Sequence, residues 1–295
     1  MRIKRYIFFL FLCMLIMIQG CTSEETISPE IPQPHEDIII EKEDESKKTE
    51  CYIYTALPEG KEIYEGNGTK IDASEKANGC IMVSQENTQG RVKLQIILNE
   101  MTYSYDIIAD GKFYDFPLQM GSGTYTVRTL ENIGGAAYSI IYSVDIEVEI
   151  SNELMPYLYS SSIVDYDEND LAVKKAMELC YVGEDDNEKI NSVFEYIKDN
   201  IKYDYEKADN VENGYISNTD ETIKDKKGIC IDYAVLMAVM LRSQNIPTKV
   251  IYGSAKEASW HSWNMVYCDG EWKLYDATFA AGGAVGEDYM ESFSY

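Results

Sequence analysis

Cys230 stands where a nucleophile could be activated. It follows the dipeptide Gly228-Ile229, and the run Val235 to Leu241 after it is apolar on every face, which predicts a buried central helix. A cysteine in the first turn of that helix would meet unpaired backbone N–H groups and the positive end of the helix dipole, which favour the reactive thiolate. On position alone, a small buried cysteine without a chemical role is an equal alternative.

The C-terminal part of the chain predicts a β-hairpin that contains the remaining groups needed for cysteine chemistry. The strand patterns Trp260–Cys268 and Glu271–Asp276 flank Asp269-Gly270, which is a strong two-residue turn signal. That turn sets the register of the two strands. The expected pairs are Cys268 with Glu271, Trp263 with Asp276, and His261 with Thr278.

In this register His261 and Asp276 are diagonal neighbours on one side of the hairpin. A carboxylate there can accept from one imidazole nitrogen and leave the other nitrogen to take a thiol proton. His35 is the only other histidine and lies in the N-terminal segment. His261 is therefore the partner that the sequence offers to a catalytic Cys230.

These residues, in this order, resemble the transglutaminase-like (transglutaminase core) superfamily. The resemblance covers roughly residues 165–280 and includes G-I-C-I-D-Y-A, H-S-W-N-M-V-Y, D-G-E-W and D-A-T-F. His261 follows Cys230 by 31 positions, and Asp276 follows His261 by 15. Many members have Asp-Pro-Thr where this chain has Asp-Ala-Thr, a difference that keeps the carboxylate.

The resemblance implies a papain-like α+β fold in which a thiolate attacks a carboxamide and forms a thioester. It implies that Cys230 is the nucleophile, His261 the general base and then acid, and Asp276 the orienting acid. The oxyanion would be met by the backbone N–H of Cys230 and by an upstream donor. Tyr203 and Tyr205 are the candidates for that donor.

Charge and residue usage argue against several other classes of function. Asp and Glu number 51 against 26 Lys and Arg, so the formal charge of −25 argues against nucleic acid as a partner. Asp165, Asp167 and Asn169 have the spacing of calcium ligands, but Asp170 and Ala176 stand where an EF-hand loop needs Gly and Glu. We therefore expect a helix cap there, no metal site and no cofactor.

The elements around the predicted triad belong to a domain that we place at residues 156–295. Asn169 or Asp170 can cap a helix that continues to Cys180, and the polar residues 185–187 can cap a second helix through Ile197. The fold class expected for the folded chain is thus α+β, with a transglutaminase-like core after a small all-β domain.

That all-β domain is expected at residues 51–155. Val92 to Leu98 and Ile140 to Ile150 alternate apolar and polar positions, as strands with one buried face do. Asp110-Gly111 separates two Tyr/Phe-rich runs as a hairpin turn would, and Gly121-Ser122-Gly123 marks another break. A sandwich-like domain follows, and both a binding module and a rigid spacer stay open as its role.

Cysteine usage leaves one pairing undecided. Besides Cys13 and Cys21, the chain has five cysteines: Cys51, Cys80, Cys180, Cys230 and Cys268. Cys51 could pair with Cys80 across the all-β domain, but spacing does not decide this. Catalysis requires Cys230 to stay reduced.

The N-terminus is typical of an exported protein. Residues 1–20 hold three basic residues and no acid, with a 13-residue apolar run, as a signal peptide does. Ile18-Gln19-Gly20-Cys21 resembles a bacterial lipobox, which implies a diacylglyceryl group on Cys21. Residues 21–50 are an acidic, proline-containing linker. We expect lipid anchoring on the extracytoplasmic side of a bacterial cell membrane; an ordinary secretory signal is the alternative.

The sequence therefore favours a membrane-anchored extracellular cysteine enzyme that acts on protein or peptide amides, as an amidase, peptidase or transamidase. A hydrolase of cell-wall peptides would use the same triad on a different substrate. The alternative from another class is a catalytically silent binding or scaffold lipoprotein that uses the all-β domain.

Overall fold

The computed structural model describes residues 48–212, 214–256 and 258–295, which all belong to one compact unit. The predicted signal peptide, the lipobox at Cys21 and nearly all of the acidic linker, with His35, lie outside the described residues. In the described part, no helix combines the length and the apolar character needed to span a membrane.

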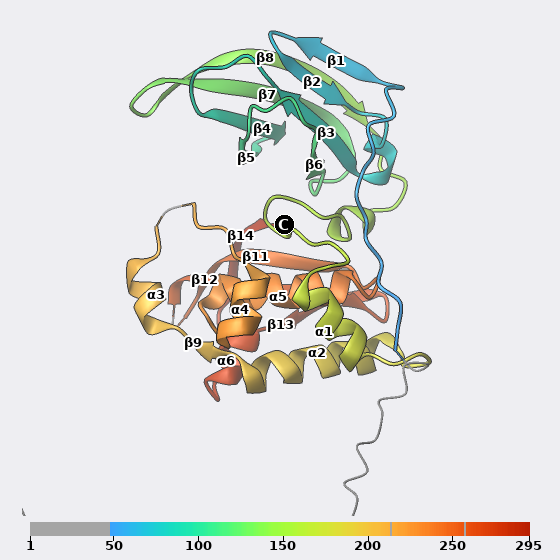
Figure 1. The fold of residues 1–295 in the computed structure, drawn as a ribbon, viewed down its shortest axis with the longest axis vertical. Coiled ribbons are helices and arrows are strands. Elements are labelled where there is room, and N and C mark those ends of the chain that lie inside the picture. The colour runs from blue at the N-terminus through green and yellow to red at the C-terminus, as the bar shows by residue number, and fades with distance from the viewer. Residues whose placement is uncertain (1–47, 213, 257) are drawn as a thin grey trace, which may run out of the picture. The chain divides into compact units, whose positions relative to one another are not determined.

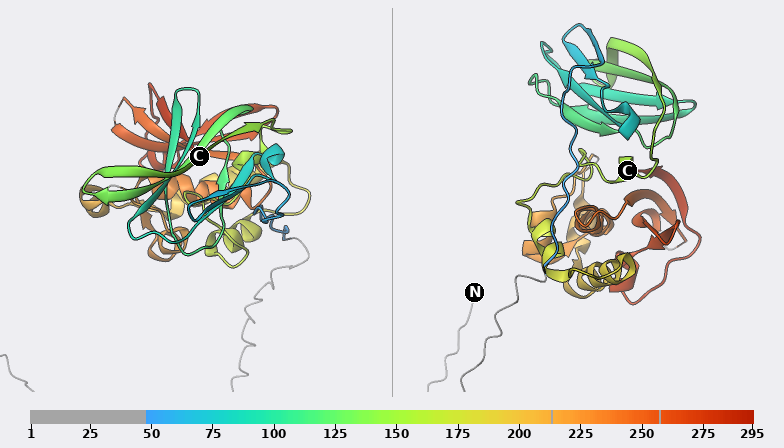
Figure 2. Two further views of the ribbon diagram at one scale, coloured as in Figure 1. Left: turned by 90° about the horizontal axis from the view of Figure 1, so that it is seen from above. Right: turned by 90° about the vertical axis from the view of Figure 1, so that its right-hand side faces the viewer.

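Strands β1 to β8 form two four-stranded antiparallel sheets, called the β-region from here on (Figures 1 and 2). One sheet has the order β1-β2-β3-β6 and the other β5-β4-β7-β8. Side chains from both sheets share one hydrophobic core. The strands are β1 (Ile63–Gly66), β2 (Thr69–Asp72), β3 (Cys80–Gln85), β4 (Val92–Leu98), β5 (Met101–Ile107), β6 (Tyr114–Pro117), β7 (Gly123–Gly134) and β8 (Ala137–Val148).

An alternation of buried and exposed side chains was predicted for β4 and β8. It holds along all of β4 and along half of β8. β4 buries Val92 and every second residue after it, as predicted. In β8, Ile146 is fully buried, whereas Ile140 is 53% exposed. The prediction of a continuous buried face was wrong because the β7–β8 ladder shifts register at Leu130, and a bulge re-aims the side chains beyond it.

The turn at Asp110-Gly111 does not close a hairpin. It links β5 to β6, but β5 pairs with β4 and β6 pairs with β3 in the other sheet. Gly111 has φ +79°, so the local bend is the one that its residue type allows. The residue types of the turn determine only the local bend. The strand partners are determined by packing in the hydrophobic core, and the hairpin prediction was therefore wrong.

The part of the chain after the β-region mixes helices and strands. A four-stranded antiparallel sheet has the order β13-β12-β11-β14, and β9 pairs in parallel with β10. Of two short 3-10 turns, η2 (Lys76–Asn78) lies between β2 and β3 in the β-region, and η3 (Met155–Tyr157) follows β8. The other elements are α1 (Leu171–Leu179), α2 (Asp186–Asn200), β9 (Lys202–Tyr203), α3 (Tyr205–Asn210), α4 (Thr219–Asp225), β10 (Lys227–Gly228), α5 (Cys230–Arg242), β11 (Thr248–Ala255), β12 (Ala258–Cys268), β13 (Glu271–Tyr275), α6 (Ala277–Ala281) and β14 (Met290–Ser294).

Helix α5 is the centre of this part, as its apolar sequence predicts. Every residue from Ile231 to Arg242 is buried, and the helix packs against α1, α2, β11 and β12. Helices α1 and α2 also form where the sequence predicts helices. Asp185 and Glu188 make a capping box at the start of α2, whereas the Asp170 carboxylate accepts from the N–H of Asp167 and leaves α1 without a side-chain cap.

Candidate active site

Cys230 is the first residue of α5, directly after the N-cap residue Ile229. Its side chain is partly exposed. Within the described residues its backbone N–H makes no hydrogen bond, as is usual in the first turn of a helix. The free N–H groups and the positive end of the helix dipole therefore lie next to the Cys230 side chain.

The residues on either side of Cys230 explain why the helix begins there. Asp232 accepts a hydrogen bond from the backbone N–H of Ile229, with Oδ2 2.9 Å from N. Gly228 leaves the room that this carboxylate needs, because a Cβ on Gly228 would lie 2.7 Å from the Cβ of Asp232. Gly228 and Asp232, two positions before and after Cys230, therefore pack against each other.

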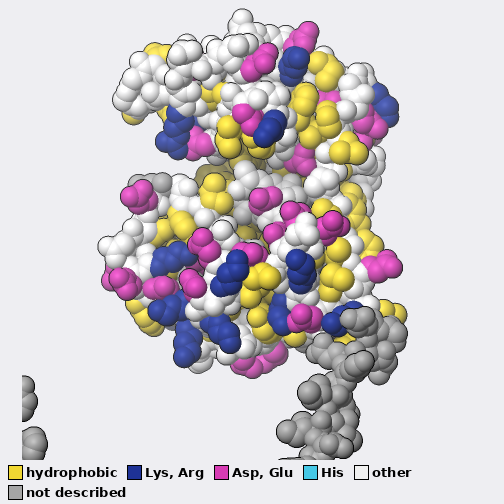
Figure 3. All heavy atoms as spheres, viewed as in Figure 1, with side chains coloured by type: hydrophobic (Ala, Val, Ile, Leu, Met, Phe, Trp, Pro, Cys, Tyr) yellow, Lys and Arg dark blue, Asp and Glu magenta, His cyan; other side chains and the backbone are white. Residues whose placement is uncertain are grey.

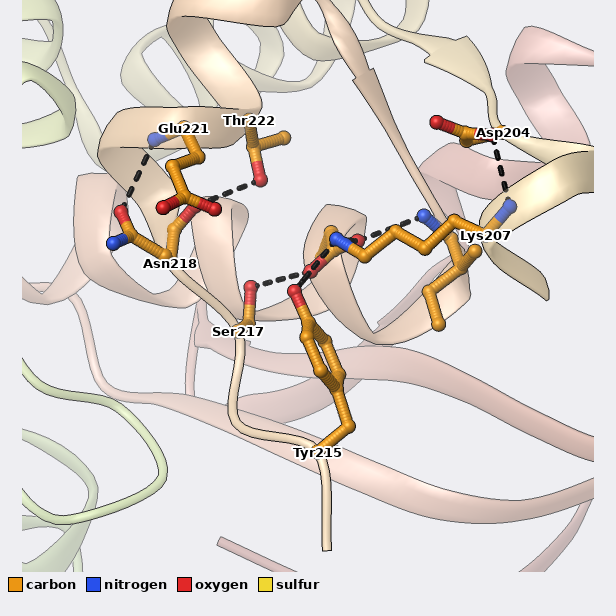
Figure 4. Close-up of polar contacts among 9 residues, drawn as sticks. Asp204, Lys207, Tyr215, Ser217, Asn218, Glu221 and Thr222 are labelled. Carbon is orange, nitrogen blue, oxygen red and sulfur yellow. Dashed lines mark hydrogen bonds and ion pairs between the residues drawn. The ribbon is translucent and has the colours of Figure 1, made fainter. Parts of the chain in front are cut away.

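The same carboxylate binds the chain segment before α5. Asp232 is fully buried, and its Oδ2 accepts from Lys207 Nζ at 2.7 Å. Its Oδ1 accepts from the hydroxyls of Tyr215 at 2.8 Å and Ser217 at 2.7 Å. Figure 4 shows Lys207, Tyr215 and Ser217 converging on one point, beside the Asn218 cap of α4. Asp232 thus ties residues 207–217 to the start of α5.

The ammonium group of Lys207 is the charge partner of this buried acid. Burial lowers the pKa of Lys207, but its hydrogen bonds to Asp232 and Tyr215 raise it more, so the pKa lies above its ordinary value. Lys207 therefore stays cationic throughout the neutral range. A buried carboxylate with a cation and three further donors carries its charge without an unpaired oxygen.

His261 lies on β12 and is buried. Its Nε2 is 2.6 Å from Asp276 Oδ2, which leaves Nδ1 as the nitrogen available to a thiol. The imidazole ring stacks on Phe279 at 4.4 Å between ring centroids and on Trp263 at 6.0 Å. Aromatic packing and the carboxylate together set the orientation of the ring.

The charge state of His261 follows from its neighbours. Burial lowers the pKa of His261, while the hydrogen bond to Asp276 and the polar contact with the Cys230 side chain raise it; the result is a pKa of about 9. The imidazole is therefore protonated at neutral pH. The side chain of Cys230 is in polar contact with this ring, so the sulfur and the imidazole are placed for proton transfer.

Asp276 performs two tasks with its two oxygens. Oδ1 accepts from the backbone N–H of Phe279 at 2.9 Å and caps α6. Oδ2 accepts from His261 and from the hydroxyl of Tyr289 at 2.8 Å. Because the cap fixes one side of the carboxylate, the other side is held toward the imidazole.

The predicted hairpin register is correct along the whole of β13. Cys268 pairs with Glu271, and the ladder continues to Asn264 with Tyr275. The next expected pairs, Trp263 with Asp276 and His261 with Thr278, do not form, because Asp276 ends the strand and begins α6. His261 and Asp276 still meet, through the cap geometry rather than across a strand ladder.

Tyr289 is a site residue that sequence reasoning missed. Besides its bond to Asp276, its ring lies 4.9 Å from that of Trp263 and 6.4 Å from His261. It follows Asp276 by 13 positions, outside the quoted motifs, and is one of 24 tyrosines. Nothing in the local pattern distinguishes it from the others.

The structure separates the two tyrosines proposed as oxyanion donors. Tyr203 is paired with Gly228 in the β9–β10 ladder and lines the same cavity as Cys230. Burial and the neighbouring Cys230 raise the pKa of Tyr203, so its hydroxyl keeps its proton. Tyr205 is 75% exposed, packs on the Tyr203 ring and does not line the cavity. Tyr203 is therefore the better placed of the two.

Cys230 and His261 open into a cavity of about 560 Å³. Its wall is largely aromatic and aliphatic, and one large apolar side chain, Trp260, is 70% exposed at the cavity. On the face seen in Figure 3, acidic and basic side chains are interspersed rather than gathered into one patch. The apolar lining of the cavity suits a substrate segment that leaves water on binding.

The five described cysteines are all free thiols, including Cys51 and Cys80. Burial raises the pKa of Cys80, Cys180 and Cys268, which disfavours their thiolates. Cys51 and Cys230 are both partly exposed. Among the described residues, no group of three or more His, Cys, Asp or Glu side chains is arranged to hold a metal ion.

Comparison with known proteins places this site in a recognised domain. Residues 176–277, which include Cys230, His261 and Asp276, match the transglutaminase-like superfamily. The chain thus contains a transglutaminase-like domain.

Two curated proteins are similar to the same part of the chain. UPF0252 protein MJ1282 from Methanocaldococcus jannaschii is 37% identical over 112 residues, which are 33% of this chain and 32% of that protein. The kyphoscoliosis peptidase of Mus musculus is 27% identical over 116 residues, which are 36% of this chain and 17% of the peptidase. The chain thus matches about a third and about a sixth of the lengths of these relatives.

Among solved structures, a proposed cysteine protease from Cytophaga hutchinsonii aligns with 73% of this chain and 83% of its own, at 17% identity and a TM-score of 0.37. A structure described as a TGase aligns with 56% of this chain and 46% of its own, at 21% identity and a TM-score of 0.32.

Proposed function

We propose that the transglutaminase-like domain is a cysteine enzyme that acts on amide bonds of proteins or peptides. The proposal rests on one observation above all: the imidazole that neighbours Cys230 is held by a carboxylate at 2.6 Å. The position of Cys230 at the start of a buried helix supports it. In this proposal Cys230 is the nucleophile, His261 the acid and base, and Asp276 the orienting acid.

The first half-reaction breaks the amide. The thiolate of Cys230 attacks the carbonyl carbon, and the electron pair of the C=O bond moves to oxygen. The free backbone N–H of Cys230 and the hydroxyl of Tyr203 are the donors for that oxyanion. The imidazolium of His261 then gives its proton to the amide nitrogen, the C–N bond breaks, the amine or ammonia leaves, and a thioester remains.

The second half-reaction uses the neutral imidazole. His261 takes a proton from water or from an amine as its oxygen or nitrogen attacks the thioester carbon. The C–S bond breaks, and sulfur leaves as the thiolate beside the restored imidazolium. Water gives hydrolysis, as in an amidase or peptidase, and an amine gives transamidation. The same three residues serve both outcomes.

Product analysis tests this function. The purified full chain in detergent is incubated with glutamine-containing peptides and with cell-wall peptides, with and without an added primary amine, and the products are identified by mass. We expect hydrolysed or amine-linked product with the unaltered protein and none with Cys230→Ser. Cys51→Ser is the matched control, because Cys51 is also a partly exposed free thiol. Equal product from Cys230→Ser would reject the proposal.

The lipid anchor also stands as a proposal. A diacylglyceryl group on Cys21 would hold the enzyme at the extracytoplasmic face of a bacterial membrane, with the acidic linker between the membrane and the folded part. Its support is the Ile18-Gln19-Gly20-Cys21 pattern after a basic and apolar N-terminus. Expression in a bacterial host, followed by detergent phase separation, should place the protein in the detergent phase and Cys21→Ser in the aqueous phase.

A further inference from the structure

The β-region has a free sheet edge at β5. In its sheet β5 is the outermost strand and pairs only with β4. The hairpin between them closes with two residues, Asn99 and Glu100, so the flanking pair of Leu98 and Met101 is a hydrogen-bonded pair. Because such pairs alternate along an antiparallel ladder, the even-numbered residues of β5 direct their N–H and C=O groups away from β4.

These outward groups have no partner in the described part of the chain. Thr102, Ser104 and Asp106 make no backbone hydrogen bond on that side. The strand also lacks the usual protection of an edge, since its sequence Met-Thr-Tyr-Ser-Tyr-Asp-Ile contains neither Pro nor Lys. Its one charge, Asp106, is paired with Arg91. The backbone of β5 is therefore available to another extended chain.

The free edge borders the catalytic cavity. Ser104, Tyr105 and Asp106 line the same cavity as Cys230 and His261. A chain lying along this part of β5 would therefore pass through the space into which the thiol opens. The cavity thus places the unpaired edge of β5 next to the proposed nucleophile.

Specific contacts hold the edge at the cavity. The hydroxyl of Tyr103 donates to the backbone oxygen of Ser294 in β14 at 2.8 Å. The rings of Tyr103 and Tyr105 lie 5.2 and 6.2 Å from that of Tyr295. β14 pairs with β11, and β11 pairs with the strand that carries His261. The edge is thus joined to the catalytic sheet through hydrogen bonds and aromatic packing.

We propose that the substrate is an extended polypeptide that adds to β5 as a further strand and so presents a backbone or side-chain amide to Cys230. This inference rests on the proposed function and assigns the β-region a direct part in substrate binding. The N–H and C=O groups of Ser104 and Asp106 pair with the backbone of the substrate. Because backbone groups are common to all residues, this mode of binding selects an extended conformation more than a sequence.

The test compares two alkylating reagents of Cys230 on the full chain. The small reagent is chloroacetamide. The second is an acetyl-capped nonapeptide of Ala, Ser, Thr and Lys that carries a chloroketone analogue of glutamine at its centre. The ratio of the two second-order rate constants, peptide over chloroacetamide, measures what the peptide backbone contributes. Chloroacetamide alone reports on the activated thiol.

Ser104→Pro removes the outward N–H. No bond to β4 is lost, because the N–H of Ser104 points away from β4, and edge positions of this kind tolerate proline. We expect the ratio to fall about tenfold, in keeping with the loss of one or two hydrogen bonds. Ser104→Ala is the matched control, since it keeps the N–H and removes the hydroxyl, and its ratio should stay unchanged. A ratio unchanged in a folded Ser104→Pro protein would overturn the proposal.

A second measurement needs no change to the protein. N-methylation of the probe, one amide at a time, removes single donors from the peptide. An added strand uses every second amide, so alternate N-methyl groups should slow the peptide reaction severalfold and the ones between them should not. A pattern without this period of two would overturn the proposal even if Ser104→Pro does not fold.

The two reagents also separate this inference from the proposed function. If chloroacetamide shows no preference for Cys230, or keeps that preference in His261→Ala, the proposed function fails and substrate addition at β5 fails with it. The other outcome is that chloroacetamide prefers Cys230 and loses that preference in His261→Ala. If the ratio of peptide to chloroacetamide rate constants is then unchanged by Ser104→Pro and by N-methylation, only the β5 proposal fails.

Discussion

His261 Nε2 and Asp276 Oδ2 lie 2.6 Å apart, and the same carboxylate caps the helix that follows it. Its second oxygen accepts from the backbone N–H of Phe279, whose ring stacks on the imidazole. The end of β13, the start of α6 and the orientation of the base are therefore set by one side chain. A change at Asp276 will act on folding and on reactivity, and the two effects can be measured apart.

Asp276→Asn and Asp276→Ala separate these effects. Asparagine still caps a helix N-terminus, so at pH 9.5, where the imidazolium of His261 no longer contributes to stability, Asp276→Asn should unfold at nearly the same denaturant concentration as the unaltered protein. Without the negative charge His261 loses its main cause of a raised pKa, and alkylation of Cys230 at pH 7 should slow by at least about tenfold. Asp276→Ala should lose the same reactivity and about 1 kcal/mol of unfolding free energy as well. Equal stability losses in the two variants would contradict this account of the cap.

The raised pKa of His261 predicts a pH-dependent stability. The folded-state pKa is about 9 against an ordinary value of 6.5, so the protonated imidazole stabilises the folded state fully below pH 6.5. This contribution, about 3 kcal/mol at most, is lost as the pH rises from 6.5 through 9.

Urea unfolding at pH 6.5, 8 and 9.5 tests this with His261→Gln as the reference. The difference in unfolding free energy between the two proteins should shrink as the pH rises across that window. A difference that stays constant, or that grows toward high pH, would show that His261 is not held as an imidazolium.

Tyr289→Phe removes one of the donors to Asp276 Oδ2 and keeps the ring against Trp263. The remaining bond from His261 should strengthen, because the carboxylate charge is shared with one donor fewer. We therefore expect the pKa of His261 to rise and the unfolding free energy to fall by about 1 to 2 kcal/mol, as for a hydrogen bond to a charged group. Proton NMR titration of the imidazole measures the first effect; a lowered pKa would contradict the assigned role of Tyr289.

The parts of the site that the sequence predicts are those that depend on local rules. The apolar run after Cys230 predicts α5, and Asp269-Gly270 predicts the hairpin register as far as Tyr275. Both features are decided within about a dozen residues, by helix burial and by turn geometry. The helix places Cys230 at its first position, and the hairpin carries His261 and leads to Asp276.

The parts that the sequence did not predict depend on distant partners. Asp110-Gly111 has the residues of a hairpin turn, but its strands join different sheets. Asp232 takes donors from Lys207, Tyr215 and Ser217, which precede it by 15 to 25 positions. No periodicity or turn signal marks such contacts, because they form only when separate elements pack together.

Asp232 supports a further prediction on stability. Asp232→Ala removes the buried partner of Lys207 and the acceptor of the Ile229 N–H, and loss of one member of a buried ion pair costs about 3 to 5 kcal/mol. Glu287→Ala breaks the exposed pair with Lys256 and should cost about 1 kcal/mol or less. Thermal or urea unfolding of the two variants gives the comparison; equal losses would mean that Asp232 does not tie residues 207–217 to α5.

The central claim is that His261 activates Cys230, and competitive alkylation tests it most directly. The full chain is treated with limiting iodoacetamide from pH 5 to pH 9, and each labelled cysteine is located by peptide mass. We predict that Cys230 is labelled ahead of the partly exposed Cys51 even near pH 6, and that His261→Ala abolishes this preference. Labelling of Cys230 that is no faster than that of Cys51, or that does not change in His261→Ala, would contradict the claim.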